Sequence, residues 1–551
     1  MKKLLMKNLK EHLNFLCNLK ERHLGSEGEK RAQEYIEKSF KEIGYQVIRE
    51  SFPAPGWKYN NYFLKTDKKY FSCFPCFYSN SCNVKGKLFP INPKYIESYN
   101  KDLKGKICII FEDINDVNKA GRISKFLEEY GANALVIVSP YENTCSTKIV
   151  REPNLKKIGI LTVSKSTARE ICKNLDKEFC LKIEGKNFTF NSYNIVAKYQ
   201  GKIDKKIVIG AHYDTSPNCP GAWDNGSGVS ILIELARYLK DKNINYSVDF
   251  VAFGGEEYGG YGYGLGGYEY FKKHKKEKIL LMGCLDSLGV YIGNVCCYVG
   301  KSNYIKNILK NLISDYNIEV YDYRPGSDNN IFNDNDIPNI WFTDYNEISS
   351  KYFYIHSPED NLKIIDFNKL EKISEIIFDT FEKLLKIELE KEMPKIKFRK
   401  MRQDDLKEVE KIVKKIWTMG VDKLREEKYG IIGRKSWDEW VWESIKSYLK
   451  EKETRKFVTE TNGKIVGFCS YRIDKVRKIG TVGYNGVNPE YSGLGIGTYQ
   501  INKVIELMKR EGMEIAEVLT GLNEGHLPAR KMYEKCGFEE FFKSILYSKK
   551  L

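Results

Sequence analysis

The 551-residue sequence lacks long apolar runs. No window approaches the ~18 apolar residues that a membrane-spanning helix needs, so we expect no membrane partner. The first residues, MKKLLMKNLKEHLNFLCNLKERH, are charged throughout and lack the uninterrupted apolar stretch of a secretory signal peptide. We therefore expect a cytoplasmic protein.

Cysteine is too scattered for a disulfide scaffold. The 14 cysteines are spread along the chain, and the CxxC formed by Cys73 and Cys76 has no second pair at zinc-ribbon spacing. The aromatic surroundings of this CxxC, YFSCFPCFYS, favour a buried strand over a metal site. Reduced thiols agree with a cytoplasmic protein.

The net charge of +16 is not accompanied by a nucleic-acid-binding motif. Lysines are scattered, with only short clusters such as KKHKKEK (272–278). We interpret the charge as a solvated, lysine-rich surface and predict no nucleic-acid partner. Hydrophobic residues make up 42% of the chain, which is enough for packed cores, and the length suggests about three or four domains.

Alternating strand and helix patterns predict an α/β fold. From residue 191 onward, apolar strands such as KKIVIGAHYD (205–214) alternate with helices such as GVSILIELARYLKD (228–241). Strands that are apolar throughout indicate a sheet covered on both faces. Residues 55–190 differ in character and suggest a small inserted module. The charged, proline-containing stretch 390–400 is typical of a linker.

Metal-ligating residue types recur where the predicted strands end. Loops at the carboxyl edge of an α/β sheet converge, so side chains placed there can meet. The chain has only six histidines, and two of them lie in these acidic stretches. Several carboxylates and imidazoles at successive strand ends make a mixed nitrogen and oxygen site, which suits zinc. In chain order the candidates are His212, Asp214, Asp224, Glu256, Glu257, Asp286 and His356.

The adjacent Glu256 and Glu257 lie in VAFGGEEYGG (251–260). Neighbouring side chains of an extended chain point in opposite directions, so two adjacent carboxylates cannot easily bind one ion. One carboxylate can hold metal while the other takes a proton from a water whose pKa the metal lowers towards ~7. The surrounding glycines allow the backbone to turn and leave room for substrate. The pair therefore predicts a ligand beside a general base.

Together these stretches resemble the cocatalytic dizinc exopeptidases of the bacterial leucyl aminopeptidase and glutamate carboxypeptidase type. The motifs are HYD, PGAWDNGSGVSILIELAR, FVAFGGEE, LDSLG, GSD, IPNI and YIHSPEDN, with RHLGSEGEKRAQEYIEKSFKEIGYQV near the N-terminus. The resemblance covers about residues 1–54 and 191–390. It implies a zinc-exopeptidase αβα sandwich with a mixed sheet.

The resemblance gives the metal centre two zinc ions and five protein ligands. It implies that Asp224 bridges both ions, and the peptide bond after this aspartate is typically cis in the family. His212 and Asp286 would complete one zinc site. Glu257 and His356 would complete the other.

The same resemblance assigns the remaining roles around the metals. Glu256 would be the general base, and Asp214 would orient His212 by a hydrogen bond, as metal-bound histidines usually require. A substrate-stabilising tyrosine is expected just before the SD of the GSD motif. The stretch there is YDYRPGSD, which leaves Tyr323 or Arg324 as the candidate.

Within the predicted insert, residues of about 60–190 resemble the protease-associated module often inserted in this family. The likeness rests on LKGKICII, EYGANALVIV and PNLKKIGILTVSK. Such modules are small, β-rich and carry no chemistry. We expect this one to cap or gate the cleft.

A second chemistry is predicted by a glycine-rich turn between a strand and a helix, within GYNGVNPEYSGLGIGTYQINKVIELMKREG (483–512). The amides of such a turn and the helix dipole form a site for a pyrophosphate, although a generic turn has the same pattern. The order of KFRKMRQDDLKEVEKI, RKFVTETNGKIVGFCSYRI, VNPEYSGLGIG and TGLNEGHLPARKMYEKCGFEE decides the matter. Over residues 396–551 it resembles the GNAT-type acetyltransferases.

This second resemblance implies acetyl-CoA as a cofactor. Val487 would precede the phosphate-binding loop, Asn523 would contact the cofactor and Tyr533 would protonate the departing CoA thiolate. Ser492 stands where the family usually has Arg or Gln, which removes one phosphate contact. The loop residues that cradle the phosphates would be Ser492, Gly493, Gly495 and Gly497.

The sequence thus predicts a zinc peptidase domain from 1–54 and 191–390, an insert at 55–190 and an acetyltransferase domain at 396–551. The predicted function is a zinc-dependent exopeptidase, an aminopeptidase acting on peptides, fused to an N-acetyltransferase with an unknown acceptor amine. The alternatives for the zinc domain are a glutaminyl-cyclase-like activity, a carboxypeptidase activity and an inactive scaffold. The last domain could also bind without catalysing.

Overall fold

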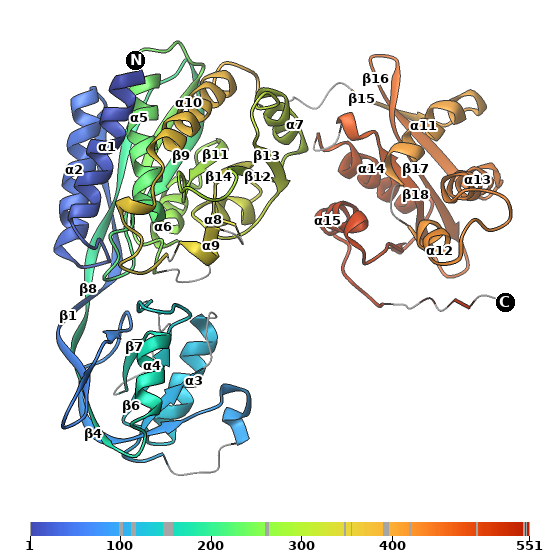
Figure 1. Ribbon diagram of the computed structural model, residues 1–551. Helices are drawn as coiled ribbons and strands as arrows, with labels where there is room; N and C mark the ends of the chain where they lie inside the picture. Colours follow the sequence, from blue (N-terminus) through green and yellow to red (C-terminus); the bar gives the residue numbers. More distant parts are fainter. Residues whose placement is uncertain are drawn as a thin grey trace. The chain divides into compact units, whose positions relative to one another are not determined.

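The computed structural model describes most of the chain. The described residues are 2–98, 103–111, 117–146, 158–258, 264–346, 349–353, 355–389, 396–417, 420–491, 494–543, 546 and 548–549. They fold as two compact units, Met1–Leu389 and Glu390–Leu551 (Figure 1). No helix in the described part of the chain is long and apolar enough to cross a membrane. All 14 cysteines are free thiols.

A mixed sheet forms the centre of the larger unit. In spatial order its strands are β13 (Glu319–Asp322), β12 (Cys296–Gly300), β14 (Asn339–Thr343), β11 (Ile279–Leu285), β9 (Ile203–His212), β10 (Tyr246–Phe253) and β8 (Glu178–Tyr199). The four strands β14, β11, β9 and β10 run parallel to one another. β8 and β12 flank them in the antiparallel direction.

Helices cover both faces of this sheet, because successive side chains of its strands alternate between two cores. In β9, Ile207 and Ile209 pack on one face and Val208 on the other. The first face carries α1 (Lys2–Asn18), α2 (Glu27–Ile43), α5 (Gly228–Leu239), α7 (Asn303–Leu312) and α10 (Phe367–Leu384) (Figure 1). The second face carries α6 (Leu265–His274) and α8 (Asn329–Asp334). The predicted α/β class is confirmed.

Two long antiparallel strands, β1 (Gln46–Lys65) and β8, lead into the inserted segment. Its remaining elements are β2 (Tyr70–Phe71), β3 (Phe74–Pro75), β4 (Cys82–Pro90), β5 (Ile107–Ile110), α3 (Val117–Glu129), β6 (Ala134–Val138), β7 (Gly159–Val163) and α4 (Lys165–Cys172). β4, β5, β6 and β7 are parallel neighbours. Short β3 lies between Cys73 and Cys76, and Cys76 is buried in the core of this segment.

The predicted limits of the insert fall inside these strands. Residues 54/55 lie in the middle of β1, and residues 190/191 lie within β8. Pro53, Pro55 and Gly56 resemble a break in the sequence. The strand continues because β1 pairs with β8 along one side and with β2 only at its far end, and an edge strand tolerates proline.

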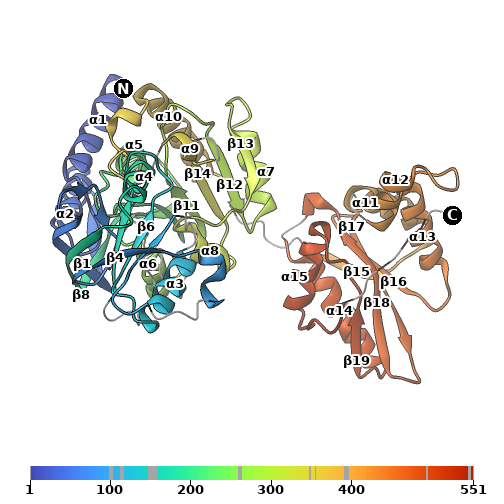
Figure 2. The same cartoon turned by 60° about the horizontal axis from the view of Figure 1, so that its bottom comes forward.

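The smaller unit has its own five-stranded sheet. Its order is β15 (Ile396–Lys400), β16 (Arg455–Thr461), β17 (Lys464–Asp474), β18 (Ile479–Val487) and β19 (Ile515–Val518). All pairs are antiparallel except β18 with β19. The helices are α11 (Leu406–Ile416), α12 (Val421–Tyr429), α13 (Trp437–Lys450), α14 (Ile496–Arg510) and α15 (Leu527–Lys535). α11 and α13 pack on one face of the sheet, and α14 and α15 on the other (Figure 2).

An ionic cluster centred on the buried His274 and Glu50 links α6 to β1. The His274 ring lies 2.6 Å from Glu277 through Nδ1 and 3.0 Å from Glu50 through Nε2. Lys273 lies 3.5 Å from Glu50, and Lys206 pairs with Glu277. Burial opposes protonation, but the hydrogen bonds to Glu50 and Glu277 outweigh it and raise the pKa of His274. The imidazolium therefore stabilises the folded state.

We expect the stabilising effect of His274 to fade as the pH rises. Because the pKa of His274 is raised in the folded state, its protonation stabilises the fold fully at pH values below the ordinary pKa of about 6.5. The stabilisation is lost as the pH rises above the folded-state pKa. His274→Gln should lower the unfolding free energy by about 1.5–3 kcal/mol at pH 6, the size of hydrogen bonds to charged groups. Thermal melts from pH 6 to 9 should show the deficit shrinking, and exposed Lys276→Gln should show no such trend. A pH-independent deficit would contradict this role.

Candidate active sites

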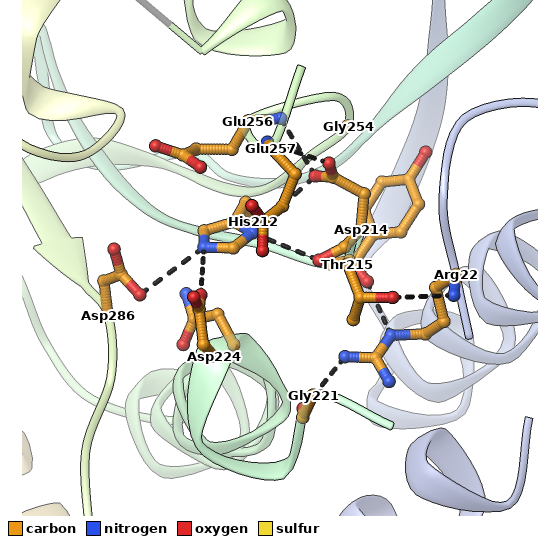
Figure 3. Close-up of polar contacts among 12 residues, drawn as sticks. Arg22, His212, Asp214, Thr215, Gly221, Asp224, Gly254, Glu256, Glu257 and Asp286 are labelled. Carbon is orange, nitrogen blue, oxygen red and sulfur yellow. Dashed lines mark hydrogen bonds and ion pairs between the residues drawn. The ribbon is translucent and has the colours of Figure 1, made fainter. Parts of the chain in front are cut away.

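The acidic and histidine residues predicted from the sequence come from different loops of the larger unit but meet at one edge of its sheet. His212 ends β9, Asp286 follows β11 directly, and Glu257 lies in the loop after β10. Asp224 lies in the turn Ala222–Ser227 that leads into α5, and the peptide bond after it is cis. His356 lies in the segment before α10. Figure 3 shows the side chains of Asp224 and Asp286 pointing toward the His212 ring.

Five of these side chains form two groups that share Asp224. In each group the potential ligand atoms lie within 4.8 Å of one another. Asp224 Oδ1 is 3.1 Å from His212 Nε2, and Asp286 Oδ1 is 3.4 Å from the same nitrogen. Asp224 Oδ2 is 3.2 Å from His356 Nε2, which lies 3.0 Å from Glu257 Oε2. Each oxygen of Asp224 therefore belongs to a different group.

The donor set fits divalent cations. Both groups combine one imidazole with two carboxylates, and the carboxylates of both groups are buried. Buried carboxylates that face one another are costly unless a cation lies between them. Glu257 Oε1 is buried without a hydrogen-bond partner among the described residues. The chemistry of these residues thus favours a metal centre over a network of protein hydrogen bonds.

Glu256 and Glu257 are held by the same carboxylate but leave the loop in different directions (Figure 3). The backbone N–H of Glu256 donates to Asp214 Oδ1 and that of Glu257 to Asp214 Oδ2, each at 3.0 Å. Glu257 turns to His356, whereas Glu256 forms no part of either ligand group. Burial raises the pKa of Glu256 despite the opposing charge of His212. A raised pKa suits a carboxylate that accepts and returns a proton.

The role predicted for Asp214 was orientation of His212. His212 Nδ1 lies 3.3 Å from the backbone oxygen of Asp214 and 3.6 Å from its carboxylate. The direct hydrogen bonds of that carboxylate go instead to the loop that carries the two glutamates. Asp214 therefore links the end of β9 to the loop after β10.

Two further buried aspartates support the centre in the same manner, and the sequence analysis missed both. Asp360 accepts the backbone N–H groups of Trp223 at 2.7 Å and Asp224 at 3.1 Å. Asp344 accepts the Trp223 indole N–H at 2.7 Å and the backbone N–H of Gly289 at 2.8 Å. Burial, with Asp224 nearby, raises the pKa of Asp360 to about 7. Asp344 could have been found from the sequence, because it directly follows β14 as His212 and Asp286 end or follow their strands.

The two candidates for a substrate-stabilising residue lie between β13 and α8. The Tyr323 hydroxyl donates to Asn330 Oδ1 at 3.0 Å. The exposed Arg324 lies over the rings of Tyr298 and Tyr345, at 5.8 and 5.7 Å. These contacts favour neither residue for that role.

Asp328 is a third carboxylate near the glutamate loop. Both of its oxygens are buried without a hydrogen-bond partner among the described residues. Gly264 separates it from Glu256, because a Cβ added at Gly264 would lie 2.5 Å from Asp328 Oδ1 and 3.2 Å from the Glu256 Cγ. Burial raises the pKa of Asp328 to about 8. The site thus has a second buried carboxyl group beside Glu256.

The second candidate site lies in the smaller unit, where pairing of β18 with β19 ends at Val482 while β18 continues to Val487. Beyond that point the Asn485 amide donates to the buried Tyr533 hydroxyl at 2.8 Å. Burial raises the pKa of Tyr533, so the hydroxyl keeps its proton.

The glycine turn follows β18 and leads into α14. Gly495 caps α14 with φ of 76°, a left-handed conformation that favours glycine. A Cβ at Gly497 would lie 2.7 Å from the Met532 sulfur, so α14 and α15 approach closely there. Asn523 accepts a hydrogen bond from the His526 backbone N–H at 3.2 Å. The predicted contacts Ser492 and Gly493 lie outside the described residues.

Both units match known families. Residues 194–381 match the profile of peptidase family M28, and residues 417–538 match that of the acetyltransferase (GNAT) family. The chain joins an M28 peptidase domain to a GNAT domain. The predicted fusion of these two folds is confirmed.

Relatives of the M28 domain include an aminopeptidase. Aminopeptidase YwaD of Bacillus subtilis is 29% identical over 307 residues, which are 51% of this chain and 63% of that protein. An uncharacterized N-acetyltransferase of Methanocaldococcus jannaschii is 38% identical over 114 residues of the GNAT part, 19% of this chain and 47% of that protein. The chain therefore spans less than two thirds of either relative.

Solved structures share the fold of the M28 domain. A zinc aminopeptidase from Bacillus subtilis covers 70% of this chain and 96% of its own, with 22% identity and a TM-score of 0.58. A peptidase M28 precursor from Shewanella amazonensis covers 71% and 97%, with 19% identity and a TM-score of 0.59. At these identities the likeness concerns the fold.

Proposed function

We propose that the M28 domain is a zinc-dependent aminopeptidase with two metal ions bridged by Asp224. Asp224 supports this most directly, because its two oxygens lie 3.1 and 3.2 Å from the Nε2 atoms of His212 and His356. Asp286 and Glu257 complete the two nitrogen and oxygen sets, which suit zinc. The relatives named aminopeptidase and zinc aminopeptidase support both the metal and cleavage at the N-terminus.

Glu256 moves the proton in the proposed reaction. Zinc, when bound, supplies a Lewis acid and lowers the pKa of water. Glu256 takes a proton from the attacking water, whose oxygen bonds to the scissile carbonyl carbon. The same carboxyl then gives the proton to the amine that leaves as the C–N bond breaks. Asp214 holds the loop so that Glu256 stays free of the ligand groups.

The segment between β1 and β8 acts in this proposal as a protease-associated cap. The Tyr141 hydroxyl donates to the backbone oxygen of Ile355 at 3.1 Å, directly before His356. The Tyr78 ring meets the Tyr258 ring edge-on at 5.6 Å, directly after Glu257. The insert thus contacts two loops that carry candidate ligands. Such a cap restricts access to chain ends, as an exopeptidase requires.

The zinc proposal is tested by metal content and product mass on the same full-length protein. We expect about two zinc ions, as in cocatalytic centres, and release of single N-terminal residues from a panel of peptides and amino-acid amides. Loss of ammonia with ring closure of N-terminal glutamine would instead indicate a glutaminyl-cyclase-like enzyme. Release of C-terminal residues would indicate a carboxypeptidase. Zinc-loaded protein without turnover would indicate a scaffold.

For the GNAT domain we propose transfer of an acetyl group from acetyl-CoA to an amine. Gly495 and Gly497, with the N-terminus of α14, would hold the phosphates through backbone N–H groups, and Val487 and Asn523 would border the cofactor. The acceptor nitrogen bonds to the acetyl carbon as the bond to sulfur breaks, and the nitrogen loses one proton to solvent, from which Tyr533 is later reprotonated. Tyr533 gives the departing thiolate its proton, with its hydroxyl held by Asn485.

Tyr533→Phe should slow acetyl transfer by roughly 10²-fold, the lower range for a general acid, and leave acetyl-CoA affinity nearly unchanged. The substitution removes the proton donor and keeps the ring that packs against Phe538. Calorimetry with acetyl-CoA and a thiol-release assay measure the two effects. Tyr429→Phe, which removes a hydroxyl that contacts Ser548 in the same unit, serves as control. Equal loss of affinity and rate would contradict proton donation.

A further inference from the structure

Arg22 places a positive charge in the interior of the M28 domain. It lies between α1 and α2 in sequence, and its side chain is fully buried. Nε donates to the backbone oxygen of Tyr213 at 2.7 Å and Nη1 to that of Pro220 at 2.6 Å. Nη2 donates to the backbone oxygen of Gly221 at 3.0 Å (Figure 3). Nη1 also donates to the backbone oxygen of Leu16 at 3.1 Å, at the end of α1.

The carbonyl acceptors bracket one irregular segment, 213–221. The first belongs to the residue after His212, and the last lies three residues before Asp224. The backbone N–H of Arg22 adds a bond to Thr215 Oγ1 at 2.8 Å within the same segment. No strand or helix spans these residues, so no ladder of regular hydrogen bonds fixes them. The segment is also held by the Tyr213 N–H, which donates to the backbone oxygen of Phe253 at 2.9 Å, and by the Asn218 N–H, which donates to Glu21 Oε2 at 2.7 Å. Arg22 is the side chain that binds carbonyls at both ends of this path between two candidate ligands of one metal ion.

The fit around the guanidinium leaves little tolerance. Gly221 has φ of 59°, and a Cβ there would lie 2.9 Å from Arg22 Nη2 and 2.3 Å from the Thr215 Cγ2. A planar fork with several fixed donors reaches carbonyls on both ends of the segment at once. Lysine has a single nitrogen and cannot reproduce this pattern.

The positive charge of Arg22 lies near buried aspartates that support the ligand loops. Burying a cation costs several kcal/mol unless opposite charge and hydrogen bonds compensate. The carboxylates of Asp360 and Asp214 interact favourably with the cation. Asp360 accepts the backbone N–H of Asp224, and Asp214 accepts that of Glu256. Neither aspartate belongs to a ligand group. Arg22 thus places a positive charge near two buried carboxyl groups that support the ligand loops.

We propose that Arg22 is a positioning residue of the metal centre, which holds the segment 213–221 so that His212 and Asp224 reach the same ion. This role rests on the proposed aminopeptidase function. Arg22 touches neither substrate nor metal in it. Its loss acts through the two ligands, and it affects metal affinity and turnover more than substrate affinity.

The test compares Arg22→Gln, Arg22→Lys and Arg22→Ala in the full-length protein with Arg49→Gln, which removes an arginine from a pair with Glu37 near the surface. Zinc affinity, kcat and KM are measured on one peptide substrate. We expect Arg22→Gln to bind zinc at least tenfold more weakly, the size of an outer-shell effect. Its kcat at saturating zinc should fall roughly 10²-fold, the cost of a misplacement of about 1 Å, with KM within a factor of about three. The zinc affinity and kcat of Arg22→Lys should lie between those of the wild type and those of Arg22→Gln.

Guanidinium chloride at low millimolar concentration separates positioning from folding. It should restore part of the kcat and zinc affinity of Arg22→Ala, and it should not raise those of the wild type or Arg49→Gln. Folding of each variant is checked by melting temperature. Unchanged zinc affinity and kcat in Arg22→Gln and Arg22→Lys would overturn the role of Arg22, as would losses that follow melting temperature alone without rescue. Wild-type protein that binds no zinc would contradict the proposed function itself.

Discussion

Asp224→Ala should abolish metal binding at both sites of the M28 domain. Its two oxygens belong to different ligand groups, so one substitution removes a ligand from each ion. Replacing only an outer partner of a metal ligand costs up to about 10²-fold in affinity, and we expect a larger loss here. Elemental analysis after gel filtration should find less than one zinc per chain, and peptide hydrolysis should fall to background.

Three further substitutions serve as comparisons and control for Asp224→Ala. His212→Ala and His356→Ala each remove a ligand from one group and should each weaken one ion. Asp204→Ala removes an exposed carboxylate from the opposite end of β9 and should change neither metal nor rate. Two tightly bound zinc ions in Asp224→Ala would show that the aspartate does not bridge them.

Glu256→Gln should separate catalysis from metal binding. The amide keeps the shape of the side chain but cannot accept a proton, so turnover should fall roughly 10²–10⁴-fold, the usual contribution of a general base. Zinc content should remain that of the wild type, because Glu256 belongs to neither ligand group. Single-turnover assays, with the enzyme in excess over the peptide substrate, measure the residual rate.

Glu257→Gln is the natural comparison, because it changes the neighbouring residue in the same way. Its carboxylate lies 3.0 Å from His356 Nε2 within a ligand group, so we expect weaker zinc at one site. Turnover should then recover in part as zinc is added. The same metal loss in both variants would show that the two glutamates do not divide the roles of ligand and base.

The candidate site was readable from the sequence where its residues follow strands. His212 and Asp286 lie at the ends of apolar runs, and the carboxyl ends of parallel strands meet without any need to know the pairing order. Chemistry and position coincide in such residues. Asp224 and His356, which the sequence analysis also placed at strand ends, lie instead in longer loops before α5 and α10. Their motifs named them all the same, so both ligand groups consist of residues that the sequence analysis had named.

The supporting contacts were not readable, because their partners are backbone groups distant in sequence. Asp360 accepts N–H groups more than a hundred residues away, and three of the four carbonyls around Arg22 lie beyond β9. Residue type does not reveal which N–H or C=O a charged side chain will meet. Arg22 appeared in the sequence only as part of the stretch RHLGSEG.

In the fold as well, local sequence patterns predicted the elements, whereas pairing between distant residues could not be predicted. Strand and helix types followed from apolar periodicity, whereas the limits of the insert did not. Pro53 and Pro55 are typical of a loop, yet the paired residues of β8 keep both in an edge strand. Tertiary pairing overrode local preference at these positions.

The β1–β8 pair makes the insert an arm that enters and leaves the M28 domain side by side. Gly56 lies opposite Phe188, and Tyr59 lies opposite Gly185, so the ladder can be closed by a short hairpin turn at that level. A deletion that closed the ladder there would remove the rest of the arm and keep the pairing of residues 46–56 with residues 188–198. The arm is joined to the sheet through β1 and β8, and it also contacts the loops of Glu257 and His356 through Tyr78 and Tyr141.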